Sequence, residues 1–482
     1  MAENSNLKKQ VLSGLTWKFG ERIIAQGVSF VVSLVLARML MPEQYGVVAL
    51  VLVFINLANV FVTNGLGESL IQKKDADSKD FSTMFFCSLF FSIILYGILF
   101  LSAPGIAAIY NNNQLILVLR ILALQVPLSS IKTIQQAYVS KHMMFKKFFY
   151  STLGGTLVSG IVGIIMAYKG MGVWALVAQY LVNSTIDTLI LFITVQWHPT
   201  LEFSIKSAKQ LTGYGWKLVI AQFINALYSE LRSLLIGKFY TTADLASYNK
   251  GNQFPSLLIT NINSSISSVL FPAMTRASDN KSKLKELTRK SIKTSSYVLF
   301  PMLAGLMAIS EPLVRVLLTE NWLPCVPFLK ISCIYWMFQP SQTANVQAIK
   351  ASGRSDICLK LEIIKKIIGI SLLLISIRIS VNAIVISNAL FAGISAVINI
   401  IPNKQLISYG VKEQISDICP SLFLSVVLYF ATSLCIKLAW GDVITIILQL
   451  IIGVFVYGVG SLILKIDVFY DVIGMLKKIG NR

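Results

Sequence analysis

The chain has 482 residues, of which 55% are hydrophobic and only 13% charged, and its mean hydropathy is +0.70. Roughly 25% of the residues of a soluble domain are charged, so this composition excludes a soluble globular protein and predicts an integral membrane protein. The formal net charge of +20 does not indicate nucleic-acid binding, because no basic run alternates with aromatic residues that could stack on bases.

The first apolar segment, residues 17–40, is long enough to cross a bilayer and ends before Pro42. It carries Lys18, Glu21 and Arg22 near its start, and such a group costs about 2.5–3.5 kcal/mol at the centre of a membrane. The residues on one face of this helix are polar, which predicts a face that packs on polar partners or borders a water-filled cavity. They are Lys18, Arg22, Gln26, Ser29 and Ser33. We expect no removable signal peptide, with this segment acting as its own insertion signal.

With roughly 20 residues per crossing, the hydropathy pattern predicts about fourteen spans. They are expected to begin near residues 15, 45, 81, 115, 149, 172, 211, 251, 292, 325, 359, 382, 415 and 443. Lys and Arg are concentrated in alternate connections such as 276–290, whereas the turns at 41–44, 111–114 and 319–324 hold none. This positive-inside pattern predicts that both chain termini face the cytoplasm.

The sequence contains an internal repeat. The segment GLTWKF at 14–19 returns 199 residues later as GYGWKL at 213–218. Two polar positions correspond at the same offset: Gln26 matches Asn225, and Ser33 matches Arg232. Six spans per copy predict two parallel six-helix lobes related by an axis along the membrane normal. The expected parts are an N-lobe at 1–205, a C-lobe at 206–402, and two further spans with a cytoplasmic tail at 403–482.

Polar faces recur on other spans, which predicts a central cavity between the lobes, whereas the last two spans read as a lipid-facing pair. The candidate substrate-binding residues are Lys18, Arg22, Asn56, Asn59, Lys132, Asn225, Arg232, Lys250 and Asn263. The candidate ion-coupling residues are Glu21, Asp187 and Glu230. Glu21 with Lys18 or Arg22, and Glu230 with Arg232, are expected to neutralise one another in part. Cations still outnumber acids, so the cavity is expected to favour an anionic substrate. For any single Asn, Gln or Ser, interhelical hydrogen bonding is the alternative.

The turn 36–46, with the sequence LARMLMPEQYG, resembles the junction of the first two helices in bacterial Wzx-type oligosaccharide flippases of the multidrug/oligosaccharidyl-lipid/polysaccharide exporter superfamily. Five further segments resemble that family in the same order: 65–74 (GLGESLIQKK), 172–177 (GVWALV), 246–250 (ASYNK), 269–272 (VLFP) and 353–356 (GRSD). The resemblance extends from about residue 10 to about residue 400 and does not rest on the last two spans.

This resemblance implies a flippase that moves undecaprenyl-diphosphate-linked oligosaccharide units across the bacterial inner membrane by alternating access. The units would serve O-antigen, capsule or exopolysaccharide assembly. Its implied partners are the lipid bilayer, H⁺ or Na⁺ as a coupling ion, and polysaccharide polymerase machinery.

Three alternatives differ from the flippase in what they require. A cation-coupled multidrug exporter of the same superfamily calls for a more acidic cavity. A membrane polymerase or ligase calls for long extracytoplasmic loops with catalytic groups, and the loops here are short. A scaffolding protein has no need of repeated polar faces. His142 and His198 are the only histidines, and the six cysteines lack metal-ligand spacing, so we expect no catalytic residue, metal or cofactor.

Overall fold

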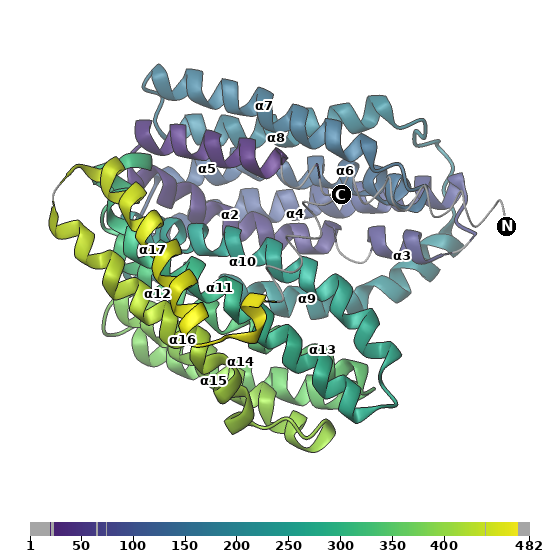
Figure 1. Ribbon diagram of the computed structural model, residues 1–482. Coiled ribbons are helices and arrows are strands. Elements are labelled where there is room, and N and C mark those ends of the chain that lie inside the picture. The colour runs from purple at the N-terminus through teal and green to yellow at the C-terminus, as the bar shows by residue number, and fades with distance from the viewer. Residues whose placement is uncertain (1–19, 21–23, 64–65, 74, 439, 471–482) are drawn as a thin grey trace. The chain divides into compact units, whose positions relative to one another are not determined.

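The computed structural model describes residues 20, 24–63, 66–73, 75–438 and 440–470, and these residues form helices and no strand (Figure 1). A helix at Ile24–Met39 precedes the others. The helices of the first half are α2 (Pro42–Thr63), α3 (Leu66–Gln72), α4 (Ser78–Tyr110), α5 (Gln114–Leu122), α6 (Gln125–Lys141), α7 (Lys146–Tyr168), α8 (Val173–Thr194) and α9 (Ile205–Phe239). Those of the second half are α10 (Thr242–Arg276), α11 (Lys281–Leu317), η1 (Glu320–Trp322), α12 (Cys325–Met337), α13 (Gln339–Ala351), α14 (Ser355–Ser376), α15 (Val381–Leu406), α16 (Val411–Ser433), η2 (Leu434–Leu438) and α17 (Asp442–Ile463).

Nine helical stretches in the described part of the chain are long and apolar enough to cross a bilayer. The predicted class, an all-α polytopic membrane protein, is therefore confirmed, and the predicted number of fourteen spans stays a prediction. The largest difference from the expected starts is at α11, which begins at Lys281 rather than near 292. The side chain of Asn280 accepts a hydrogen bond from the backbone N–H of Lys283 at 3.0 Å. This N-cap starts the helix in charged residues ahead of the apolar segment.

The chain divides into two compact units, Met1–Ala246 and Ser247–Arg482. The lobe boundaries expected from the repeat stay a prediction. In the first unit α2 is central, because α4, α5, α6, α8 and α9 all pack against it. Its side chains are buried accordingly; Ile55 and Val62 are both 0% exposed. The helices α7 and α8 lie side by side along their lengths (Figure 1).

The start of α2 makes a close backbone contact with the start of α10. A Cβ atom built on Gly46 would lie 1.8 Å from the carbonyl oxygen of Thr242. Only glycine allows two backbones to approach this closely. The turn with the sequence MPEQYG therefore ends in a glycine for a packing reason.

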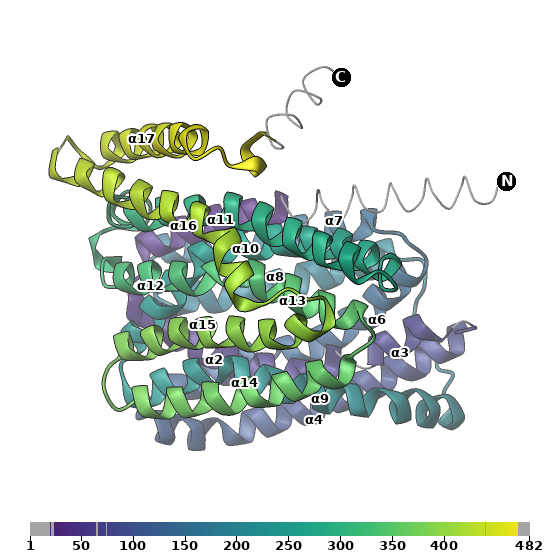
Figure 2. The same cartoon turned by 60° about the horizontal axis from the view of Figure 1, so that its bottom comes forward.

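In the second unit α11 is central, and α12, α13, α16 and α17 pack against it (Figure 2). Ionic contacts tie it to the last two helices at both ends. Near its start, Nη2 of Arg289 lies 2.7 Å from Oδ1 of Asp417 on α16. Near its end, Nη1 of Arg315 lies 3.8 Å from Oδ1 of Asp442 on α17. Within this unit α16 therefore runs parallel to α11, and α17 runs antiparallel to it.

An irregularity in α11 contributes to this docking. Pro301 has no N–H, so the carbonyl of Tyr297 lacks its regular helical donor. The hydroxyl of Tyr457 on α17 donates to that carbonyl at 2.8 Å. The hydroxyl of Tyr297 is in turn 2.9 Å from Oγ of Ser461, also on α17. The two tyrosines thus join α17 to α11 where the helix ladder is interrupted.

Candidate functional site

The first unit holds polar faces on α2 and α9, which lie antiparallel to each other. Nδ2 of Asn56 donates to Oε1 of Glu230 at 3.2 Å, and the rings of Phe61 and Phe223 lie 4.9 Å apart. Positions further along α2 thus meet earlier positions on α9. Three further polar residues of α9 are exposed: Gln222, Asn225 and Ser229. These two helices present amide, hydroxyl and carboxylate groups along one packed pair.

Glu230 and Arg232 do not pair, and the expected neutralisation of one by the other is wrong. Glu230 accepts from Asn56, whereas the guanidinium of Arg232 lies 6.0 Å from the centroid of the Tyr228 ring. Residues two apart on a helix point in different directions and do not face each other. Nε of Arg232 is buried without a hydrogen-bond partner, so this cation keeps an unused donor.

A second charged pair joins α6 to α8. Nζ of Lys132 lies 3.1 Å from Oδ2 of Asp187, and the Lys132 side chain is 25% exposed against 9% for Asp187. The other carboxylate oxygen of Asp187 is buried without a hydrogen-bond partner. A Cβ on Gly155 of α7 would lie 3.2 Å from the Cβ of Asp187, so a small residue there lets α7 close over the pair. The pair is nearly dry on the acid side and partly open on the lysine side.

The other predicted site residues lie in different surroundings. The Oδ1 atom of Asn59 on α2 is buried without a hydrogen-bond partner. In the second unit Lys250 is only 5% exposed, with its Nζ 5.7 Å from the Trp322 ring centroid. Nδ2 of Asn263 donates to Oγ1 of Thr343 at 2.8 Å. Lys250 is thus packed among neighbours in this structure, and Asn263 links α10 to α13.

Three predicted residues, Lys18, Glu21 and Arg22, lie outside the described residues. Among the predicted site residues that the structure describes in the first unit, two are cations, Lys132 and Arg232, and two are acids, Asp187 and Glu230. Their charges balance within this unit, while the second unit adds the cation Lys250. The excess of cations in the cavity stays a prediction that rests on Lys250 and the first helix.

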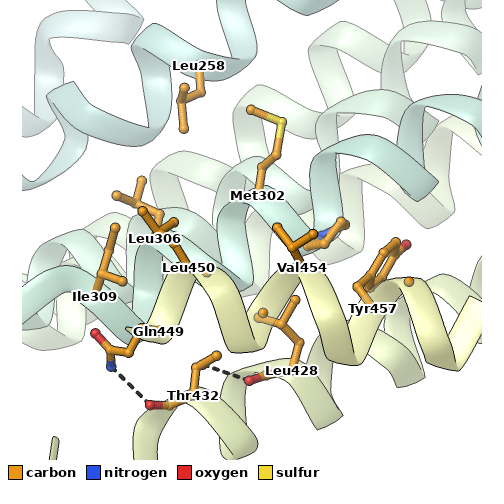
Figure 3. A pocket seen from close by; sticks show the side chains of 14 residues that line it. Leu258, Met302, Leu306, Ile309, Leu428, Thr432, Gln449, Leu450, Val454 and Tyr457 are labelled. Atoms are coloured by element: carbon orange, nitrogen blue, oxygen red, sulfur yellow. Dashed lines mark hydrogen bonds between the residues drawn. The ribbon is translucent and has the colours of Figure 1, made fainter. Parts of the chain in front are cut away.

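The second unit contains an apolar cavity of about 530 Å³ between α10, α11, α16 and α17 (Figure 3). Its labelled lining residues are Leu258, Met302, Leu306, Ile309, Leu428, Thr432, Gln449, Leu450, Val454 and Tyr457. Nε2 of Gln449 donates to the Thr432 carbonyl at 3.1 Å and to the Ala308 carbonyl at 3.2 Å. The Nε2 group of the one amide in the lining is therefore turned to neighbouring backbone, while its Oε1 is buried without a hydrogen-bond partner. Most of the other lining residues are apolar.

Sequence reasoning missed this cavity because it treated the last two spans as lipid-facing. The inner faces of these spans are small or polar. Buried examples on α17 are Thr445, Gln449, Gly453 and Ser461. Their steps of four, four and eight residues place them on one helical face, and this spacing was the available signal.

The described residues thus define a multi-pass helical membrane protein with paired charges and amides inside its helix packing, and such groups mark functional sites in membrane proteins. A family model described as "Polysaccharide biosynthesis protein" matches residues 35–327. The chain belongs to this family, and the resemblance found in its motifs is confirmed.

Characterised relatives support the same placement. The chain is 24% identical over 359 residues to the teichuronic acid biosynthesis protein TuaB of Bacillus subtilis (strain 168), covering 73% of each chain. It is 25% identical over 372 residues to the lipopolysaccharide biosynthesis protein WzxC of Escherichia coli (strain K12), covering 77% of this chain and 76% of WzxC.

Solved structures show the same fold. The lipid II flippase MurJ in an inward closed conformation matches with a TM-score of 0.74 at 15% identity, over 96% of this chain and all of the MurJ chain. An inward-facing multidrug resistance MATE transporter of the MOP superfamily matches with a TM-score of 0.61 at 14% identity, over 80% of this chain and 94% of its own. The fold is therefore shared by transporters of different cargo, and cargo must be argued from the residues.

Proposed function

We propose that the protein is a flippase that translocates undecaprenyl-diphosphate-linked oligosaccharide units across the bacterial inner membrane by alternating access. Such a cargo has a glycan and a diphosphate that cannot cross roughly 30 Å of hydrocarbon unaided, because their polar groups would lose their hydrogen bonds to water. It also has a long apolar chain. The supporting observation is that one protein carries both polar, charge-bearing helix faces and a hydrocarbon-lined cavity.

The polar groups have separate roles in this proposal. Asn56, Asn59, Asn225 and Asn263 bind sugar hydroxyls, while Lys18, Arg22, Lys132, Arg232 and Lys250 bind the diphosphate, Arg in a bidentate manner. Lys132 is held by Asp187 until an anion arrives. The unused Nε donor of Arg232 suits a phosphate oxygen. Glu21, Asp187 and Glu230 are the acids that would carry H⁺ or Na⁺ if ion exchange drives transport.

The apolar cavity takes part of the isoprenoid chain in this proposal. Its volume of about 530 Å³ lies within the range of roughly 300–1,000 Å³ that is usual for small-ligand pockets. Most of the residues that line it are apolar, so the chain is held chiefly by burial of apolar surface. The transporter acts without catalytic residues and delivers its product to polysaccharide polymerase machinery.

A cation-coupled multidrug exporter remains the second candidate, because the MATE fold is shared. The family and its named relatives favour polysaccharide cargo. The two candidates differ in the charge of the cargo, and Arg232 is the described residue that separates them. A cationic drug would be repelled by this side chain, whereas a diphosphate would be attracted to it.

The test uses Arg22→Ala, Arg232→Ala and the double variant in a flippase-deficient strain, with membrane abundance measured by blot. We expect each Ala variant to lose surface polysaccharide at normal abundance, and Arg232→Lys to retain part of it because charge survives without bidentate geometry. Arg276→Ala is the matched control, since Arg276 is an exposed residue at the end of α10. Full export by the double variant would refute the cationic site.

Orientation is tested separately by cysteine labelling in the turns. Asn112→Cys lies between α4 and α5, and Ser278→Cys lies between α10 and α11. With both termini in the cytoplasm, a membrane-impermeant thiol reagent should label the first from outside and the second only after the membrane is opened. Labelling of both from outside would contradict the proposed topology.

A further inference from the structure

A row of polar residues is buried along α15. Ser395, Asn399 and Asn403 follow one another at steps of four, so they lie on one face of the helix. Ser395 and Asn399 are each 1% exposed, and Asn403 is 0% exposed. Buried polar groups in proteins are nearly always hydrogen-bonded. Each polar side-chain group of these three residues is therefore expected to have a hydrogen-bond partner.

The Asn403 end of the row is paired with α13 and α16. Nδ2 of Asn403 donates to Oδ1 of Asn345 at 2.7 Å. Asn345 and Gln414 exchange two hydrogen bonds, each 2.9 Å long, between their amide groups. At this end, hydrogen bonds join amides from three helices.

The other end of the row has unpaired groups. Nδ2 and Oδ1 of Asn399 are both buried without a hydrogen-bond partner. The same holds for Oγ of Ser395 one turn before and for Oδ1 of Asn403 one turn after. Four adjacent unpaired atoms on one face are costly to keep dry, because each has lost water without a replacement. Something that hydrogen-bonds must occupy this row.

The chemistry of the unpaired atoms identifies the occupant. Asn399 presents both a donor and an acceptor, so its occupant must accept and donate at once. A metal cation could bind the oxygens but would face the N–H groups of Asn399, and the row contains no carboxylate. Side chains one helical turn apart have their Cβ atoms about 5–6 Å apart, a separation that one water bridges with two hydrogen bonds. We propose that Asn399 holds buried water, which bridges it to Ser395 and Asn403.

This site goes beyond the proposed transport function and does not depend on it. A water-bridged row can be rebuilt after a small shift of one helix, because water re-orients where a direct side-chain contact breaks. Within the row this applies to Ser395 and Asn399, because Asn403 is joined directly to Asn345 on α13.

Pulsed X-ray radiolysis followed by mass spectrometry tests the proposal on the full-length protein in detergent. Bound water generates hydroxyl radicals locally, so Ile400, which is only 5% exposed, should be oxidised in the wild type. Asn399→Leu has the same branched shape without polar atoms, and oxidation of Ile400 should fall at least fivefold in it. Ser395→Ala is a smaller change and should lower the oxidation of Ile400 in part. This variant provides the test if Asn399→Leu fails to fold.

Thermal unfolding gives an independent readout. If water is bound, Asn399→Leu loses it together with its hydrogen bonds, and the Tm should fall by about 2–6 °C. If the row is dry, the same substitution removes two unpaired groups and the Tm rises. An unoxidised Ile400 in the wild type, or a raised Tm in Asn399→Leu, overturns the proposal.

Discussion

Replacement of Gly46 by alanine tests the contact between the starts of α2 and α10. The added Cβ would lie 1.8 Å from the Thr242 carbonyl oxygen, and contacts under 3.0 Å are essentially never seen. One backbone must therefore retreat by more than an ångström. Thr242 offers backbone atoms rather than a flexible side chain at this point, so the strain cannot be relieved by a rotamer change. Overpacking of this kind typically costs about 1–3 kcal/mol.

The matched control is Gly97→Ala in α4, where a Cβ would meet nothing within 4 Å. Both substitutions gain about 1 kcal/mol of helix propensity, so their difference isolates the contact. We expect the Tm of purified Gly46→Ala to lie about 2–12 °C below that of Gly97→Ala. Export in a flippase-deficient strain should fall with it, because α2 is the central helix of its unit. Equal Tm and equal export in the two variants would refute the reasoning.

Three further predictions follow from described contacts. Asp187→Ala should destabilise the protein by about 3–5 kcal/mol because it leaves the Lys132 charge uncompensated. In a double-mutant cycle of Tm values, the variant with both Lys132→Ala and Asp187→Ala should be less destabilised than Asp187→Ala alone, and additive effects would contradict the pairing. Leu306→Trp should fill the apolar cavity and reduce export at unchanged membrane abundance; normal export would remove the cavity from the transport path. Two hydrogen bonds from Arg354, each 2.9 Å, lower the pKa of the exposed Asp356 to about 2. The contribution of that pair is present above the ordinary value near 3.8 and is lost only as the pH falls through about 2, so Asp356→Asn should change the Tm equally at pH 5 and pH 8.

The class of fold could be predicted because bilayer thickness sets helix length and hydrocarbon excludes charge. The turn containing Gly46 was recognised by its resemblance to a family motif. The packing contact that requires glycine there could not be predicted, because its partner Thr242 is distant in sequence. Likewise the partner of Glu230 is Asn56 on another helix. No local sequence pattern shows that Glu230 bonds to Asn56 rather than to the nearby Arg232. Lys250 lies on a helix face that looks polar in sequence, yet it is only 5% exposed and Trp322 of η1 lies beside it. Periodicity shows that a face is polar and leaves open what covers it.

The docking of α17 has a consequence for how this protein can vary. Its Tyr457 hydroxyl bonds a carbonyl that is available only because Pro301 interrupts α11. A regular α11 would retain that carbonyl for itself, and the tyrosine would need another acceptor. The proline and the tyrosine are 156 residues apart in the chain, yet each depends on the other. A variant that replaces Pro301 and restores the regular helix loses the Tyr457 hydrogen bond. A chimaera that takes α17 from this protein must also keep a proline at position 301 of α11.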